Sequence, residues 1–189
     1  LESLKKISRN AEELESMINN LLDIQNLESD RMVFDYGKFK VDELMSQICK
    51  KFESKIIETK IQLVNTTRES IVIRSDELRI KQVLSHLIDN AIDFVPKENG
   101  KIEICVQEAD DFVSFFVKDN GVGILKEKQE NLFKKFYQVS QGHTRKHGGV
   151  GLSISICKGI ITKLGGKIWV ESEPGKGTTF NFNIPKIRE

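Results

Sequence analysis

Segment 112–123 reads Phe112-Val113-Ser114-Phe115-Phe116-Val117-Lys118-Asp119-Asn120-Gly121-Val122-Gly123. Its apolar half predicts a strand, and its second half predicts a tight turn at the end of that strand. On its own, an Asp-Asn-Gly turn is typical of an ordinary hairpin. The interpretation of this turn therefore depends on the segments around it.

Further motifs lie on both sides of the turn, and each is weak evidence alone. Upstream, Ser85-His86-Leu87-Ile88-Asp89-Asn90-Ala91-Ile92-Asp93-Phe94 places an asparagine among the apolar residues of a helical pattern. Downstream, Leu132-Phe133-Lys134-Lys135-Phe136-Tyr137 precedes a basic loop. That loop leads into Gly148-Gly149-Val150-Gly151-Leu152-Ser153-Ile154, where a second helical pattern begins. Near the C-terminus stands Ser172-Glu173-Pro174-Gly175-Lys176-Gly177-Thr178-Thr179-Phe180.

The order of these motifs resembles the ATP-binding domain of sensor histidine kinases, a branch of the GHKL superfamily that also holds gyrase, heat-shock chaperone and mismatch-repair ATPases. In that family they are the N box, first glycine box, F box, second glycine box and closing hairpin. The resemblance covers residues 32–189 and implies an α+β fold, a two-layer sandwich of GHKL (Bergerat) type with helices over a mostly antiparallel sheet. Residues 1–31 are similar to the second helix of the family's dimerisation bundle.

Hydrophobic periodicity along the chain favours the same α+β class. Helical spacing covers residues 41–57, and a second helical stripe begins after Asp76, a suitable N-cap, and is stopped by Pro96. Residues 32–39 mix apolar residues with a glycine and predict a short edge strand. Further strands are predicted at 61–64, 71–73, 102–106, 112–117, 168–172 and 178–184.

The first 31 residues predict one long amphipathic helix. Its apolar residues recur at intervals of three and four positions: Leu4, Ile7, Ala11, Leu14, Ile18 and Leu21, flanked by Met17 and Ile24. This stripe either packs on the core of its own chain or pairs with a helix of another. Because no neighbouring helix in the sequence offers a partner, we expect a homodimer formed through this helix.

Adenine recognition requires a hydrogen-bond acceptor for the exocyclic amine, and a carboxylate at a strand end beside glycines meets that requirement. Asp119 is the residue that the resemblance implies for this role, with Gly121 and Gly123 letting the backbone approach the ring. Asn90 is implied as the magnesium ligand, because a neutral amide oxygen can complete a coordination shell shared with phosphates and water. Phe94, Ile124 and Thr178 are the other residues implied at the nucleotide.

The phosphates are expected at the start of the second helical pattern, because a helix N-terminus offers free amides and a partial positive charge. Gly149, Val150, Gly151 and Leu152 occupy that position. The basic loop before it is the expected lid, with Arg145 as the first candidate for a phosphate contact and Lys135 as the second. Phe133 and Phe136 are expected to anchor this lid in the apolar layer.

The sequence departs from the family pattern at three positions. Asp93 stands where relatives often present a lysine or arginine to the phosphates, so we expect weaker or more magnesium-dependent binding of ATP. His86 replaces the glutamate with which gyrase-type relatives activate water, which argues against efficient hydrolysis. Imidazole can act as a base near neutral pH, but we expect instead a helix histidine with satisfied hydrogen bonds. His147 stands where the second glycine box usually has glycine.

The histidines are His86, His143 and His147, and none is followed by an acidic residue as the family's phosphoacceptor is. The resemblance therefore implies a kinase that donates the γ-phosphoryl group of ATP to a histidine on a helix outside this segment, with a response regulator as a further partner. A non-catalytic nucleotide-responsive or partner-binding module is the alternative. An ATPase that hydrolyses its own nucleotide is disfavoured by His86.

Composition excludes several other classes. The 29 basic and 28 acidic residues nearly cancel, so we expect no nucleic-acid partner. No apolar run approaches the ~20 residues that span a bilayer, and we expect a cytoplasmic segment of a parent that can be membrane-anchored. The three cysteines, Cys49, Cys105 and Cys157, are scattered in apolar patterns and are expected to be reduced.

Overall fold

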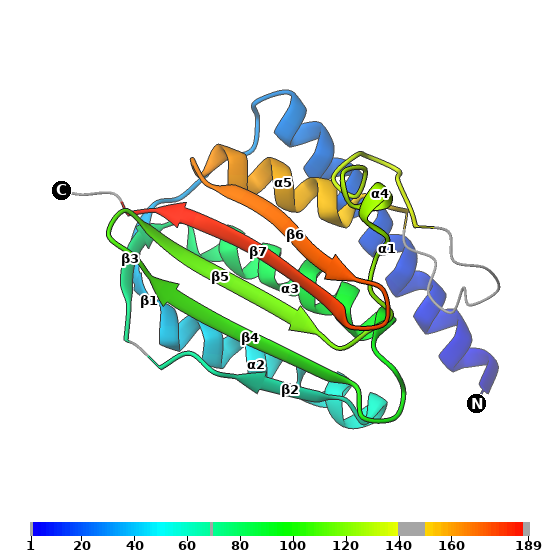
Figure 1. Ribbon diagram of the computed structural model, residues 1–189. Coiled ribbons are helices and arrows are strands. Elements are labelled where there is room, and N and C mark those ends of the chain that lie inside the picture. The colour runs from blue at the N-terminus through cyan, green and yellow to red at the C-terminus, as the bar shows by residue number, and fades with distance from the viewer. Residues whose placement is uncertain (1, 69, 140–149, 187–189) are drawn as a thin grey trace.

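A computed structural model describes residues 2–68, 70–139 and 150–186 of the chain. It contains a five-stranded sheet, a two-stranded sheet and helices that cover one face of the larger sheet (Figure 1). The elements in chain order are α1 (Glu2–Glu28), β1 (Gly37–Lys40), α2 (Val41–Thr59), β2 (Gln62–Asn65), β3 (Val72–Ser75), α3 (Glu77–Phe94), β4 (Lys101–Glu108), β5 (Phe112–Asp119), α4 (Lys126–Gln129), α5 (Ser153–Lys163), β6 (Lys167–Glu173) and β7 (Gly177–Pro185). The predicted α+β sandwich is confirmed.

The five-stranded sheet has the order β2-β4-β5-β7-β6. In this sheet β2 and β4 are parallel, and the other three pairs are antiparallel. The expected mostly antiparallel sheet is confirmed. The register places Asp119 at the end of β5 directly opposite Thr178 on β7, and Thr178 opposite Ser172 on β6. Three polar residues are thereby aligned across three strands at one end of the sheet.

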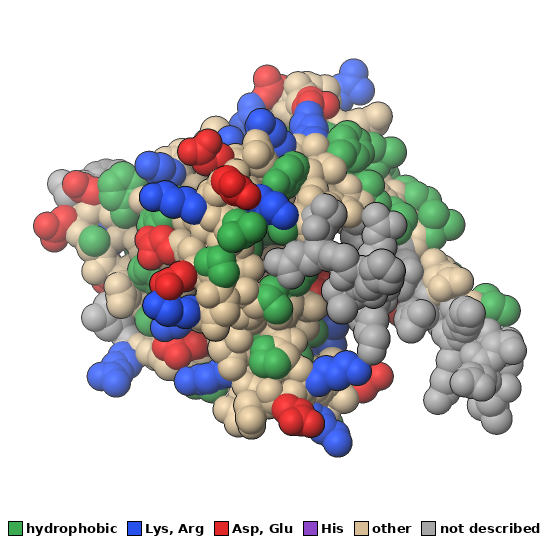
Figure 2. All heavy atoms as spheres, turned by 45° about the vertical axis from the view of Figure 1, so that its right-hand side comes forward, with side chains coloured by type: hydrophobic (Ala, Val, Ile, Leu, Met, Phe, Trp, Pro, Cys, Tyr) green, Lys and Arg blue, Asp and Glu red, His purple; other side chains and the backbone are tan. Residues whose placement is uncertain are grey.

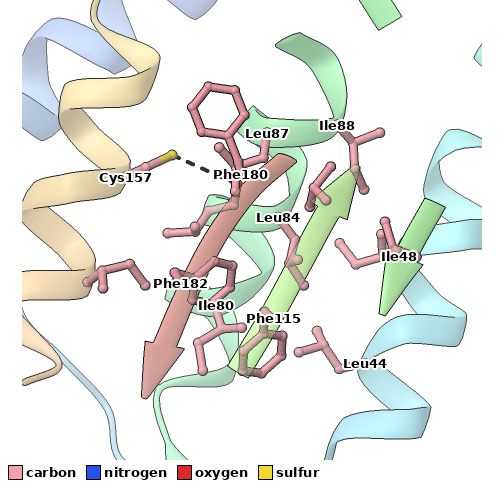
Figure 3. Packing of buried hydrophobic residues seen from close by; sticks show 14 of the residues in the cluster. Leu44, Ile48, Ile80, Leu84, Leu87, Ile88, Phe115, Cys157, Phe180 and Phe182 are labelled. Atoms are coloured by element: carbon pink, nitrogen blue, oxygen red, sulfur yellow. Dashed lines mark hydrogen bonds between the residues drawn. The ribbon is translucent and has the colours of Figure 1, made fainter. Parts of the chain in front are cut away.

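The central helix α3 begins and ends where the sequence predicted. The Asp76 side chain caps it, because its Oδ1 accepts from the Arg79 N–H at 2.9 Å. At the other end Val95 leaves the helical conformation immediately before Pro96. The eight buried residues of α3 include Leu84, Leu87 and Ile88, which face the sheet in Figure 3.

The core lies between the helices and the sheet (Figure 3). Phe115 and Phe182 stack on neighbouring strands, with ring centroids 4.7 Å apart. Cys157 on α5 is fully buried, and its thiol lies 3.9 Å from the Val83 carbonyl oxygen on α3. All three cysteines are free, as expected.

The predicted strand over residues 32–39 is wrong in extent. Only Gly37–Lys40 forms β1, and it pairs with β3 in the separate two-stranded sheet. The preceding segment instead packs against the start of α3: the Asp35 N–H donates to Asp76 Oδ2 at 2.9 Å, and Phe34 lies beneath the Arg79 guanidinium. Hydrogen bonding to the helix cap thus replaces a strand ladder in this segment.

Helix α1 presents two apolar surfaces. Near its end, Ile24 is 6% exposed within the core, and Leu27 packs beside Gly159 of α5. The other surface is exposed: Ile7, Leu14, Ile18 and Leu21 are 64%, 58%, 52% and 47% exposed. Figure 2 shows hydrophobic side chains along α1 at the right-hand edge of the molecule. Neither α1 nor another helix of the described ranges is long and apolar enough to cross a membrane.

Candidate functional site

Asp119 is a buried carboxylate, 6% exposed, at the end of β5. Its Oδ1 accepts from the Gly121 N–H at 2.7 Å and from the Thr178 N–H at 3.3 Å. Among the described residues none donates to Oδ2. Burial raises the pKa of the Asp119 carboxyl above its ordinary value, although the two backbone hydrogen bonds act in the opposite direction. The site therefore holds a carboxylate with one oxygen left for a ligand.

The turn after Asp119 fits between two neighbouring elements because it is made of glycine. A Cβ added to Gly121 would lie 2.7 Å from both Asp119 Oδ1 and the Phe94 carbonyl oxygen at the end of α3. Gly123 has φ +70°, and an added Cβ would lie 2.1 Å from the Glu173 carbonyl oxygen on β6. Larger residues at either position would push the turn away from α3 and from the β6–β7 hairpin.

Two polar side chains that the sequence did not single out support this turn. Ser172 Oγ accepts from the Ile124 N–H at 2.8 Å and lies 2.9 Å from Thr178 Oγ1. Gln129 on α4 donates to the Ile124 and Ser172 carbonyl oxygens, both at 2.8 Å. The sequence could not reveal these roles. The position of Ser172 opposite Thr178 depends on the register of β6 and β7, and Gln129 belongs to no motif.

Asn90 and Phe94 lie on α3, and the Phe94 carbonyl borders the glycine turn. Asn90 is half-buried, whereas the Phe94 side chain is 46% exposed. No cluster of three or more His, Cys, Asp or Glu side chains in the described ranges is arranged to hold a metal. A magnesium ion at Asn90 would therefore depend on oxygens from the nucleotide and from water for its remaining ligands.

The second glycine turn precedes α5 and is joined to the F-box segment. The Phe136 N–H donates to the Gly151 carbonyl oxygen at 3.0 Å, Val150 packs against the core, and Leu152 is 2% exposed within it. Gly149 and Arg145 lie outside the described residues. Helices α3 and α5 are packed side by side, and the C-terminal end of α3 and the N-terminal end of α5 lie towards the end of the molecule where β5 stops (Figure 1).

Phe133, Phe136 and Lys135 of the F box lie in different environments in the structure. Phe133 packs against the core as expected, but Phe136 is 62% exposed, so its predicted anchoring role is wrong. The backbone at Phe136 has φ +60° as its N–H bonds to Gly151, and its side chain is left on the surface. Lys135 forms an ion pair with Glu28 at the end of α1.

His86 lies on α3 one helical turn before Asn90. The expectation of satisfied hydrogen bonds is wrong, because its Nε2 is buried and has no hydrogen-bond partner in the described part of the chain. Burial lowers the pKa of His86, against the opposing influence of Asp89 and of Asp23 on α1. Asp23 also accepts from the Gln82 amide at 2.6 Å, so the end of α1 is hydrogen-bonded to α3 one turn before His86.

Residues 75–188 match the family described as histidine kinase-, DNA gyrase B- and HSP90-like ATPases. Among curated proteins, the sensor histidine kinase WalK of Bacillus subtilis is 35% identical over 179 residues, which cover 92% of this chain and 28% of WalK. The chain thus spans about a quarter of the length of that relative.

Solved structures agree with this similarity. The catalytic domain of the histidine kinase ThkA is 36% identical with a TM-score of 0.70, covering 80% of this chain and 96% of that domain. ThkA in complex with the response regulator protein TrrA is 31% identical with a TM-score of 0.77, covering 98% of this chain and 51% of that chain.

Proposed function

Because this chain belongs to the family of histidine kinase-, DNA gyrase B- and HSP90-like ATPases, we propose that it binds ATP with magnesium and donates the γ-phosphoryl group to a histidine outside residues 1–189. The observation that carries the proposal is the Asp119 carboxylate. It is buried, two backbone amides hold its Oδ1, and its Oδ2 accepts from no described residue. A buried acceptor of this kind suits the exocyclic amine of adenine.

The residues around Asp119 form the adenine end of the proposed site. Gly121 and Gly123 bring the backbone close to the carboxylate without side chains. Thr178 stands opposite Asp119, and Ile124 is tied to Ser172 beside it. Phe94 contributes an exposed ring from the end of α3. These residues can enclose the purine of a nucleotide whose phosphates extend toward α5.

The phosphate end depends on α3 and α5. Asn90 supplies the amide oxygen for magnesium, and the backbone N–H groups of Val150 to Leu152, just before α5, can bind phosphate oxygens. Magnesium would neutralise phosphate charge there. Lys135 already has a carboxylate partner in Glu28, so Arg145 is the preferred lid cation.

The transfer itself requires a partner helix. The three histidines of the chain lie at positions 86, 143 and 147, none of them in α1. We assign residues 1–31 to a dimerisation bundle and residues 32–189 to the catalytic domain, in a cytoplasmic part of the parent protein. A response regulator is the proposed downstream partner, by similarity to ThkA, which has been solved with TrrA.

Isothermal titration of the chain with ATP and magnesium tests this function. Asp119→Asn should weaken ATP binding by about 10- to 100-fold, since a hydrogen bond to a charged group contributes ~1.5–3 kcal/mol. The matched control is Asp110→Asn, because Asp110 is exposed in the turn before β5, at the opposite end of the strand from Asp119; this variant should leave the affinity unchanged. If wild-type protein binds no ATP at millimolar concentration, the kinase function is rejected in favour of a partner-binding module.

A further inference from the structure

Ser172, Thr178 and Asp119 form a row of cross-strand neighbours on β6, β7 and β5. Asp119 and Thr178 are both 6% exposed, and Ser172 is half-buried. Ser172 Oγ has three polar neighbours: the Ile124 N–H at 2.8 Å, the Gly177 carbonyl oxygen at 2.9 Å and Thr178 Oγ1 at 2.9 Å. The chemistry of these partners determines the direction of each hydrogen bond.

A serine hydroxyl has one proton to donate and two lone pairs to accept with. The Gly177 carbonyl oxygen can only accept, so it takes the Ser172 proton. The Ile124 N–H can only donate, so it takes one lone pair. The contact with Thr178 must then use the second lone pair of Ser172, and Thr178 is the donor.

Because Thr178 Oγ1 donates its proton to Ser172, it can only accept hydrogen bonds from other partners. The Thr178 backbone N–H is also committed, because it donates to Asp119 Oδ1. The row therefore offers two acceptors, Thr178 Oγ1 and Asp119 Oδ2. Without Ser172, the Thr178 hydroxyl could rotate toward the carboxylate of Asp119, the strongest acceptor on the neighbouring strand, and would compete with a ligand donor there.

We propose that Ser172 is a positioning residue for adenine recognition: it directs the Thr178 proton away from Asp119, so that both residues accept from the exocyclic amine. This role rests on the proposed binding of ATP. It adds a residue that makes no contact with the nucleotide itself and that acts through the hydroxyl of Thr178.

The test pairs Ser172→Ala with removal of the amine from the ligand. Titrations compare ATP with purine riboside triphosphate, which has the same ribose and phosphates but no exocyclic amine. Wild type should prefer ATP by about tenfold or more, and Ser172→Ala should reduce that preference by about three- to tenfold. Ser172→Thr retains a hydroxyl and should retain the preference.

Two further variants and a melting curve separate positioning from folding. Thr178→Val should lower the ATP preference as Ser172→Ala does, and the double variant should be no worse than either single variant, because both act on one hydrogen bond. Equal weakening of both nucleotides by Ser172→Ala, or an unchanged preference, would overturn the role of Ser172. Failure of wild type to bind either nucleotide would instead remove the proposed function on which it rests.

Discussion

Asp119 is a charged residue placed where its charge is poorly solvated, which is unfavourable for the fold and useful for a binding site. Two backbone N–H groups donate to Asp119 Oδ1, but no described residue donates to Oδ2. The pKa of Asp119 is raised because the effect of burial is larger than that of these two hydrogen bonds. A donor on a ligand would add a hydrogen bond to Oδ2.

Asp119→Asn should therefore raise the melting temperature of the nucleotide-free protein at neutral pH. The pKa of Asp119 is raised in the folded protein. Its contribution to stability is therefore fully present below its ordinary pKa of 3.8 and is lost as pH rises through the folded-state pKa. The amide keeps an acceptor for Gly121 and Thr178 without charge, and each kcal/mol gained corresponds to roughly 2–4 °C.

Thermal melts between about pH 4 and pH 7.5 measure this effect. The difference between Asp119→Asn and wild type should shrink as pH falls and Asp119 becomes protonated. A lower melting temperature for Asp119→Asn at neutral pH would show that the carboxylate stabilises the fold through contacts that the amide cannot replace.

At the scale of elements, α1 divides its apolar residues between two environments. Ile24 enters the core and Leu27 packs on α5 beside Gly159, while Leu22 on the same turn as Ile24 is 50% exposed. The end of α1 is further attached through ion pairs of Glu28 with Lys135 and of Asp30 with Lys163. Exposed ion pairs contribute little to stability, so the apolar contacts should dominate this docking.

Ile24→Ala should destabilise the chain by about 2–4 kcal/mol, because truncation leaves a cavity in a packed core. Leu22→Ala is the control on the same helix and should cost less than about 1 kcal/mol. Equilibrium denaturation in urea at low micromolar protein gives both values. Similar small costs for the two variants would mean that the end of α1 is not part of the cooperative core.

At the scale of the whole molecule, the chain buries one face of its sheet under helices but leaves the outer stripe of α1 exposed. Ile7, Leu14, Ile18 and Leu21 are spaced as in a coiled-coil seam, and each is about half exposed or more. An apolar stripe of this length is suited to association with a second helix. We infer that this stripe is where two copies meet.

The double variant Leu14→Glu/Ile18→Glu should be monomeric where wild type is dimeric, because it places charges within the seam. Ser16→Glu/Asn19→Glu adds the same charge at exposed positions away from the stripe and should remain dimeric. Sedimentation velocity over a concentration series distinguishes the two states. A wild-type chain that stays monomeric at high micromolar concentration would exclude self-association through α1.

Local patterns in the sequence were sufficient for most elements and for the glycine turn that holds Asp119. Alternating apolar residues predicted β4 and β5, Asp76 and Pro96 marked the limits of α3, and the glycine turn located Asp119. These features depend on neighbouring residues, through backbone conformation and side-chain periodicity, so they can be recognised without knowing the packing.

Tertiary structure alone decided which surfaces and polar groups meet. Periodicity shows that one side of α1 is apolar, but it does not say that Ile24 joins the core while Ile18 stays exposed. The pairing of Lys135 with Glu28 likewise joins segments far apart in the sequence. The proton direction between Ser172 and Thr178 depends on the register of β6 and β7, because hydrogen-bond geometry is set by distances between strands.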